Sequence, residues 1–374
     1  MNRRPSQSRT GFDSFSPQHT AHFKAAQPGG EFFEPKPRAS LGRRLLLALL
    51  LMMMITLAVN LAVNQFVRVA RVTVPIRRMD PAFEGYTLLQ ISDLKGATYG
   101  SNQALIRFAL QNEDFDAVVF TGDMVSSRGN AQPLYALIEM LRELKPDAPI
   151  YMIPGDKDPL PASMSYATGG SPFAPWVLGA KQRGGQLLSA PVQIERDGHT
   201  LWLTTSALLS LDMDTMQAQF ERQYLDALAN GDENAIELTT YNLQWLTETR
   251  NARAKMTDAD VYIALTHVPP VDEELESAYP GSLRERVHLV LCGHYQGGLI
   301  RLPFAGALFI PSQNLPLYGL LPGADTYFGL TRKGRTYLYV SPGLGGNDGL
   351  YPLPFFRLFN PPTVSLISLT TSSL

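Results

Sequence analysis

Five short apolar segments, each with a charged or imidazole side chain at its end, constrain most strongly what this chain can fold into. They lie at 86–92, 116–122, 149–153, 261–267 and 288–294. Amphipathic segments of helical length separate the first three, so the pattern predicts strand, helix, strand, helix, strand. This alternation is typical of an α/β domain. Open α/β sheets place their sites at the carboxyl ends of the strands, so we expect the polar residues to meet there.

The polar side chains at these ends are candidate metal ligands or phosphate-binding groups. They are Asp93, Lys95, Asp123, Asp156, Lys157, His267, His294 and Gln296. A single aspartate after a strand is commonly a turn or cap residue, and a single histidine there is commonly structural. Five such endings in one chain favour a shared site. The chain has one cysteine, so any metal must be held by histidine and carboxylate side chains.

Five sequence blocks resemble those of a known family. QISDLK, FTGDMV, IPGDKD, LTHVPP and LCGHYQGGLIRLPFAG are similar, in that order, to the blocks of calcineurin-like metallophosphoesterases, in particular their membrane-associated bacterial branch. The resemblance covers about residues 86–369. It implies an α/β sandwich of two facing mixed sheets flanked by helices. It also implies a two-metal site and an ancestral activity of metal-dependent phosphoester hydrolysis.

The resemblance also shows where this chain departs from the family at the first metal. Asp123 corresponds to the aspartate that bridges both ions, and Asp93 to a ligand of the first ion. Lys95 and Gln296 stand where the family has two histidine ligands of that ion. The first site has therefore lost two of its four ligands, and we expect no second metal in this chain.

The donors of the other ion are retained. They are Asp123, Asp156, which replaces the family's asparagine, His267 and His294. We therefore expect one divalent ion, of Mn, Zn or Fe. Lys157 stands where the family has its catalytic histidine, and imidazole is far better suited than an ammonium group to proton transfer near neutral pH. Ordinary two-metal catalysis is not expected.

The two lysines suggest how the negative charge of the altered site is neutralised. Unpaired buried carboxylates are costly, so we expect the Lys95 ammonium at the first-metal position, paired with Asp93 and Asp123. The residues expected to contact a phosphorylated substrate are Lys95, Lys157, Tyr295 and Gln296, with the two lysines also the catalytic candidates.

Two functions remain open at this stage. The first is a degenerate family member, a pseudoenzyme that binds or regulates and recognises phosphorylated or lipid-linked envelope material. The second is a residual phosphoesterase that uses one metal, with the lysines as electrostatic clamps, on a cell-envelope phosphoester. The apolar stretches 314–323 and 350–359 allow either a groove facing the membrane or ordinary core packing. The net charge of -2 gives no reason to expect nucleic-acid binding.

An apolar run near the start of the chain predicts a membrane anchor. Residues 45–63 contain only Thr56 and Asn60 as polar interruptions, close to the ~20 residues needed to cross a bilayer. We expect a disordered cytoplasmic tail at 1–44, a transmembrane anchor at 45–66, a linker at 67–85 and the phosphoesterase domain at 86–374.

The distribution of basic residues predicts the orientation of this anchor. Eight lysines and arginines precede the run and four follow it at 64–80, which favours a cytoplasmic N-terminus and an extracytoplasmic domain. The pair Arg43 and Arg44 leaves open a cleaved twin-arginine export signal, which delivers the domain to the same side.

Overall fold

A computed structural model describes most of the chain. The described residues are 40–126, 128–166, 171–271, 283–298, 300–302, 304–310, 319–323, 327–345 and 357–372. Residues 1–53 and 54–374 form two separate compact units. The predicted tail lies almost entirely outside the described residues, as does most of the two apolar stretches that allowed a groove.

Helix α1 (Leu41–Val63) contains the predicted span. Its most apolar window has a mean hydropathy of 2.6 and is 6% buried, so it is long and apolar enough to cross a membrane. The helix has no acidic residue in its first turn and no basic residue in its last, and its amphipathic character is weak. Its sequence is therefore apolar on all sides, as expected of a helix surrounded by lipid.

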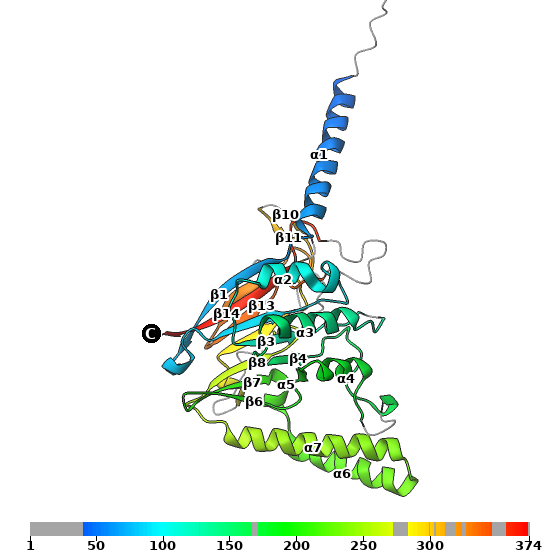
Figure 1. Ribbon diagram of the computed structural model, residues 1–374, viewed down its shortest axis with the longest axis vertical. Helices are drawn as coiled ribbons and strands as arrows, with labels where there is room; N and C mark the ends of the chain where they lie inside the picture. Colours follow the sequence, from blue (N-terminus) through cyan, green and yellow to red (C-terminus); the bar gives the residue numbers. More distant parts are fainter. Residues whose placement is uncertain are drawn as a thin grey trace, which may run out of the picture. The chain divides into compact units, whose positions relative to one another are not determined.

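Two six-stranded mixed sheets form the body of the second unit (Figure 1). The first contains, in spatial order, β1 (Arg68–Arg77), β14 (Thr363–Ser372), β2 (Thr87–Ile91), β3 (Ala117–Thr121), β4 (Ile150–Ile153) and β5 (Gly185–Leu187). The second contains β12 (Gly329–Lys333), β13 (Thr336–Val340), β9 (Leu289–Cys292), β8 (Val261–Leu265), β7 (His199–Thr205) and β6 (Val192–Arg196). β10 (Arg301–Leu302) and β11 (Gly306–Ala307) form a separate small sheet.

The helices of this unit cover the sheets or connect their strands. They are α2 (Ala104–Leu110), α3 (Gln132–Leu144), α4 (Pro175–Gln182), α5 (Ser206–Ser210), α6 (Met213–Asn230) and α7 (Glu233–Lys255), with short 3-10 turns at η1 (Pro81–Phe83), η2 (Ser101–Gln103), η3 (Met164–Tyr166) and η4 (Leu283–Arg286). Helices α6 and α7 lie side by side along much of their length.

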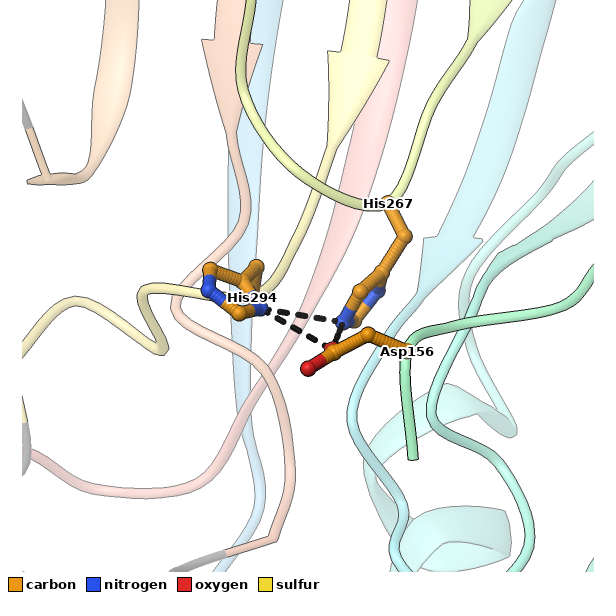
Figure 2. A group of neighbouring side chains, drawn as sticks. All are labelled: Asp156, His267 and His294. Carbon is orange, nitrogen blue, oxygen red and sulfur yellow. Dashed lines mark hydrogen bonds and ion pairs between the residues drawn. The ribbon is translucent and has the colours of Figure 1, made fainter. Parts of the chain in front are cut away.

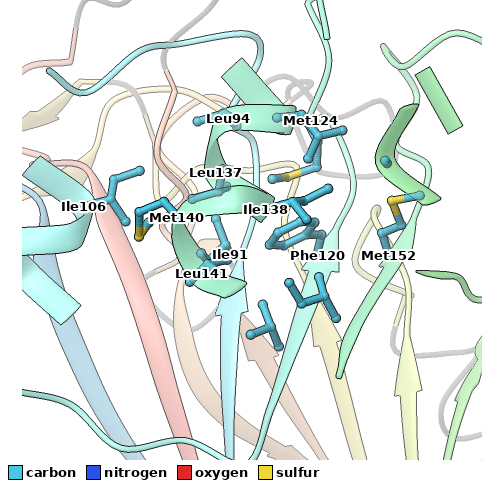
Figure 3. Packing of buried hydrophobic residues seen from close by; sticks show 14 of the residues in the cluster. Ile91, Leu94, Ile106, Phe120, Met124, Leu137, Ile138, Met140, Leu141 and Met152 are labelled. Atoms are coloured by element: carbon cyan, nitrogen blue, oxygen red, sulfur yellow. The ribbon is translucent and has the colours of Figure 1, made fainter. Parts of the chain in front are cut away.

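Strand β3 explains how the layers are held together. All five of its residues are buried. Val118 and Phe120 pack with α2, α3 and α4 in one core cluster, which Figure 3 shows from close by, while Val119 packs in a second cluster with strands of the other sheet. A strand buried on both faces needs a continuous apolar run, which is the pattern that predicted it. The fold is therefore the predicted α/β sandwich.

One segment differs from the sequence prediction. The expected linker at 67–85 contains β1, whose neighbour in the sheet is the distant strand β14, aligned in parallel from Arg68 to Arg77. β13 likewise pairs in parallel with β9, which lies well before it in the chain. Both pairings join strands far apart in sequence, which local patterns do not encode.

Candidate metal and phosphate site

The carboxyl ends of strands from both sheets meet at one site. Asp93 follows β2, Asp123 follows β3 and Asp156 follows β4 in the first sheet. His267 follows β8 and His294 follows β9 in the second. Because β2, β3 and β4 are parallel neighbours, and so are β8 and β9, their polar ends lie together. This is the arrangement predicted for an α/β sheet.

The backbone at these ends is unusual. The residues with left-handed φ are Asp93 (55°), Lys95 (50°), Asp123 (55°), His294 (66°) and Gln296 (51°). Non-glycine residues rarely adopt this conformation, and it persists where the surrounding structure over-determines it, commonly at functional sites. Backbone hydrogen bonds fix it here: Lys95 N donates to Asp123 O at 2.8 Å, and Asp93 N to Gly122 O at 3.0 Å.

Two glycines allow the loops to approach closely. A Cβ at Gly122 would lie 2.6 Å from His267 Nδ1, and one at Gly155 would lie 2.2 Å from Asp123 Oδ1. Real Cβ atoms do not tolerate such contacts, so only glycine fits at either position. The glycines in FTGDMV and IPGDKD therefore bring His267 and the carboxylates together.

Asp156, His267 and His294 form a compact group, shown in Figure 2. Asp156 Oδ1 lies 3.0 Å from His267 Nε2 and 3.1 Å from His294 Nδ1, and the two ring nitrogens are 3.3 Å apart. His267 Nε2 is also 3.3 Å from Asp123 Oδ2. Three of the four groups that the resemblance assigned to one ion thus converge on a common point, and the fourth, Asp123, contacts His267.

His267 is oriented toward this point by its other ring nitrogen. Nδ1 lies 2.8 Å from the carbonyl oxygen of Thr121, which leaves Nε2 directed at the carboxylates. Burial opposes protonation of His267, but hydrogen bonds to Asp123 and Asp156 outweigh it and raise its pKa to about 11. Burial and the neighbouring His267 lower the pKa of His294. The carboxylates of Asp123 and Asp156 therefore favour positive charge at this point.

The donor atoms fit a divalent metal ion. Ligand atoms of Asp156, His267 and His294 all lie within 4.8 Å of one another. Asp123 Oδ2 is buried and lies 3.3 Å from His267 Nε2 and 3.3 Å from Lys95 Nζ, between the two halves of the site. Mixed carboxylate and imidazole donors suit Mn, Fe and Zn. These residues would hold the ion.

Lys95 occupies the other half of the site. Its Nζ lies 3.3 Å from Asp123 Oδ2 and 3.9 Å from Asp93 Oδ1, and its side chain is 9% exposed. The predicted pairing of Lys95 with both carboxylates is therefore present. Asp93 Oδ2 accepts hydrogen bonds from Ser92 Oγ at 2.6 Å and from His294 N at 3.1 Å. Asp93, Asp123 and His267 form a second group of potential ligands, and Lys95 contacts its two carboxylates.

The remaining predicted residues lie in different environments. Lys157 is half-exposed, and its Nζ contacts Asp156 Oδ2 at 2.7 Å. Hydrogen bonds, first with His267 and also with Lys157, hold the pKa of Asp156 well below its usual range despite its partial burial. Tyr295 and Gln296 are each only 5% exposed, and Tyr295 packs in the core of the second sheet. Lys157 is thus the predicted phosphate contact that faces solvent.

Sequence reasoning missed two residues that support the site. Asp158 accepts hydrogen bonds from Val125 N at 2.7 Å and Gly155 N at 2.8 Å, and so ties the loops after β3 and β4 together. Its position inside IPGDKD was a usable signal. The fully buried guanidinium of Arg357 donates to the carbonyl oxygens of Gln296, Pro342, Gly345 and Asn360. A lone arginine in the apolar stretch 350–359 was the corresponding signal.

Comparison with known proteins yields one family and one curated relative. The sequence profile described as "Calcineurin-like phosphoesterase" matches residues 86–296. "Uncharacterized metallophosphoesterase YkuE" of Bacillus subtilis (strain 168) is 26% identical over 267 residues, which cover 70% of this chain and 73% of that protein.

Two solved structures are also similar. Phosphopantetheinyl Hydrolase (PptH) from Mycobacterium tuberculosis is 12% identical with a TM-score of 0.35, covering 74% of this chain and 96% of its own. TT1561 of Thermus thermophilus is 11% identical with a TM-score of 0.34, covering 70% of this chain and 90% of its own.

Proposed function

The chain belongs to the calcineurin-like phosphoesterase family, and we propose that it is a one-metal member without two-metal catalysis. In this proposal it acts as a binding or regulatory protein for phosphorylated material of the cell envelope. The observation that carries the proposal is the buried Lys95 ammonium, 3.3 Å from Asp123 Oδ2 and 3.9 Å from Asp93 Oδ1.

The charge of Lys95 argues against a second ion. An ammonium between two buried carboxylates supplies positive charge that the family obtains from its first metal. A divalent cation at the same place would face strong repulsion at short range in a medium of low polarity. Two family histidines are also replaced in this half, by Lys95 and Gln296, which leaves Asp93, Asp123 and His267 as its potential ligands beside the ammonium.

The other half retains what metal binding requires. Asp123, Asp156, His267 and His294 would hold one divalent ion, in keeping with the family's use of divalent metals. When bound, such an ion supplies positive charge that attracts a phosphoryl oxygen. Lys157, exposed beside Asp156, adds a second positive group that a phosphate approaching from solvent meets first.

A residual one-metal phosphoesterase is the second candidate. The observation that favours it is the intact donor group, in which Asp156 Oδ1 and the two imidazoles lie within 3.3 Å of one another. Lys95 and Lys157 would then stabilise negative charge that develops on the phosphoryl group. Lys157 would also have to protonate the leaving oxygen, a role for which an ammonium group is poorly suited near neutral pH.

We further propose that α1 anchors the domain in the cell membrane. Its hydropathy, its length and the basic residues that precede it favour a single pass with the N-terminus in the cytoplasm. The phosphoesterase domain then lies outside the cytoplasm, where the phosphorylated components of the envelope are found.

Metal stoichiometry tests the proposal most directly. Full-length protein, purified in detergent with Mn²⁺ or Zn²⁺ present, is expected to contain one ion per chain by elemental analysis. The variant H267A should contain none, whereas the matched control H199A, which changes an exposed histidine paired with Asp80, should retain the ion. Two ions per chain, or none, would contradict the one-metal proposal.

Turnover of an aryl phosphodiester with added Mn²⁺ separates the two candidate functions. A binding protein should show no hydrolysis at any metal concentration. Hydrolysis that H267A abolishes and H199A preserves would instead establish the residual phosphoesterase.

A further inference from the structure

A small surface sheet exposes apolar side chains where a soluble protein normally shows polar ones. It consists of β10, β11 and two bridges, one pairing Phe309 with Leu320 and the other Ile300 with Leu358. Its exposed apolar residues are Leu302, Phe304, Phe309, Leu320, Leu321 and Phe359. Exposed apolar residues that gather in this way, rather than singly, mark interaction surfaces.

The opposite side of the same sheet is already used by the core. Ala307 and Ile310 are completely buried and pack with residues of the second large sheet. A two-sided surface strand usually alternates apolar and polar residues. Here the side that faces the core includes Arg301, whose guanidinium lies over the Phe328 ring, whereas the exposed side chains named above are all apolar.

Hydrogen bonds connect this sheet directly to the end of α1. Asn60 Nδ2 and Asn64 Nδ2 both donate to Arg357 O at 2.6 Å, and Phe359 N donates to Asn60 Oδ1 at 2.9 Å. Asn60 is 4% exposed, although it lies in an otherwise exposed apolar helix. Leu358, between these two partners, is the residue that bridges to Ile300. The helix end and the small sheet are thus one hydrogen-bonded assembly.

We infer that the six exposed apolar side chains form a membrane seat, which enters the surface of the same lipid leaflet from which α1 emerges. The inference rests on the proposed anchoring by α1. We identify lipid as what covers the seat, because hydrogen bonds hold the seat beside the last turns of α1, which we propose to span the membrane. Aromatic and aliphatic side chains at that level partition into the boundary between headgroups and acyl chains.

Hydrogen bonds also connect the seat to the loop that carries His294. The Arg357 guanidinium donates to Gln296 O at 3.0 Å, and Asn360 Nδ2 donates to Gln296 O and Gly298 O at 2.7 Å. The loop that carries His294 is therefore held by the same residues that join the sheet to α1. A seat in the leaflet places this loop near the phosphate groups of the bilayer.

Site-directed spin labelling of the full-length protein tests the inference. The only native thiol, Cys292, is completely buried and should not react, so a single introduced cysteine reports alone. The variants F304C and L321C label the seat, and the matched control L225C labels an exposed apolar residue of α6. M54C labels the middle of the predicted span. Each is placed in phosphatidylethanolamine and phosphatidylglycerol nanodiscs, where collision with oxygen and with a water-soluble nickel complex is measured.

We expect labels at 304 and 321 to lose most of their nickel collisions and gain oxygen collisions relative to 225. If labels at positions 304 and 321 show the same collisions as the label at 225 while position 54 lies deep in lipid, the inferred seat is wrong and the anchor stands. Position 54 in water would instead overturn the anchor. Dipolar broadening between labels at 304 in both detergent and nanodiscs would show that a second copy of the chain covers this surface, and would also overturn the inference.

Discussion

The two halves of the site share Asp123 but differ in the cation they are built to hold. On one half, Lys95 is buried to 9% exposure between Asp93 and Asp123. On the other, His267 and His294 converge on Asp156, whose side chain is 35% exposed. A lysine two residues after Asp93 thus gives the buried carboxylates of one half a covalently attached cation. We propose that an exchangeable ion serves the other half.

Replacing Lys95 should have the largest effect on stability. K95M leaves Asp93 and Asp123 buried without their cation, and breaking a buried ion pair in this way costs about 3–5 kcal/mol. Urea unfolding of the metal-free protein in detergent, followed by tryptophan fluorescence, should show this loss. A decrease below about 1 kcal/mol would mean that the ammonium does not neutralise the two carboxylates.

Restoring the family's histidines at positions 95 and 296 should create a second metal site in the half that now contains Lys95. The double variant K95H/Q296H is expected to bind two ions per chain, against the one that we propose for the native protein, because it regains the two missing ligands. Elemental analysis measures the change, and K95H alone is the control, with fewer donors for the second ion. A double variant that still binds one ion would show that more than these two side chains excludes it.

The half of the site that contains His267 and His294 should tolerate a conservative change better than the half that contains Lys95. D156N keeps an oxygen donor, and the family itself has asparagine there, but the variant loses a negative charge. We expect it to retain one ion with metal affinity reduced by about tenfold or less, since affinity follows the charge of the ligand set. Titration of the metal-free protein with Mn²⁺ measures the affinity. Complete loss of binding would show that the carboxylate is indispensable at this position.

Lys157 should matter least for stability. It is half-exposed and pairs with Asp156 at the open side of the site. Exposed ion pairs contribute about 0–1 kcal/mol, so K157A should leave urea unfolding of the metal-free protein within about 0.5 kcal/mol of the native value. A loss as large as that of K95M would remove the contrast between a buried and an exposed lysine.

The body of the fold could be predicted from the sequence where a strand is buried on both faces. β3 is continuously apolar and fully buried, and it lies within the segment 116–122 that the sequence predicts as a strand. β1 could not be placed, because its partner β14 lies at the far end of the described sequence. The local sequence pattern predicts that a strand exists. Which strand lies beside it in the sheet depends on residues far away in the sequence.

The site could be predicted through residue types at strand ends, and its supporting contacts could not. Asp123 follows a strand of the first sheet, and His267 and His294 follow parallel neighbours of the second, so all three lie at carboxyl ends of strands. The role of Arg357 depends on four carbonyl oxygens that only the folded loops bring together. The orientation of His267 likewise depends on the carbonyl oxygen of Thr121.

The position of β14 between β1 and β2 determines when the domain is able to fold. During synthesis β1 leaves the ribosome early, and its sheet neighbour is made last among the described strands. Until then β2 is the open edge of the sheet and β1 has no neighbour in it, and open edges invite pairing with other chains. The first sheet is therefore completed only after translation of β14, which delays folding of the nascent chain.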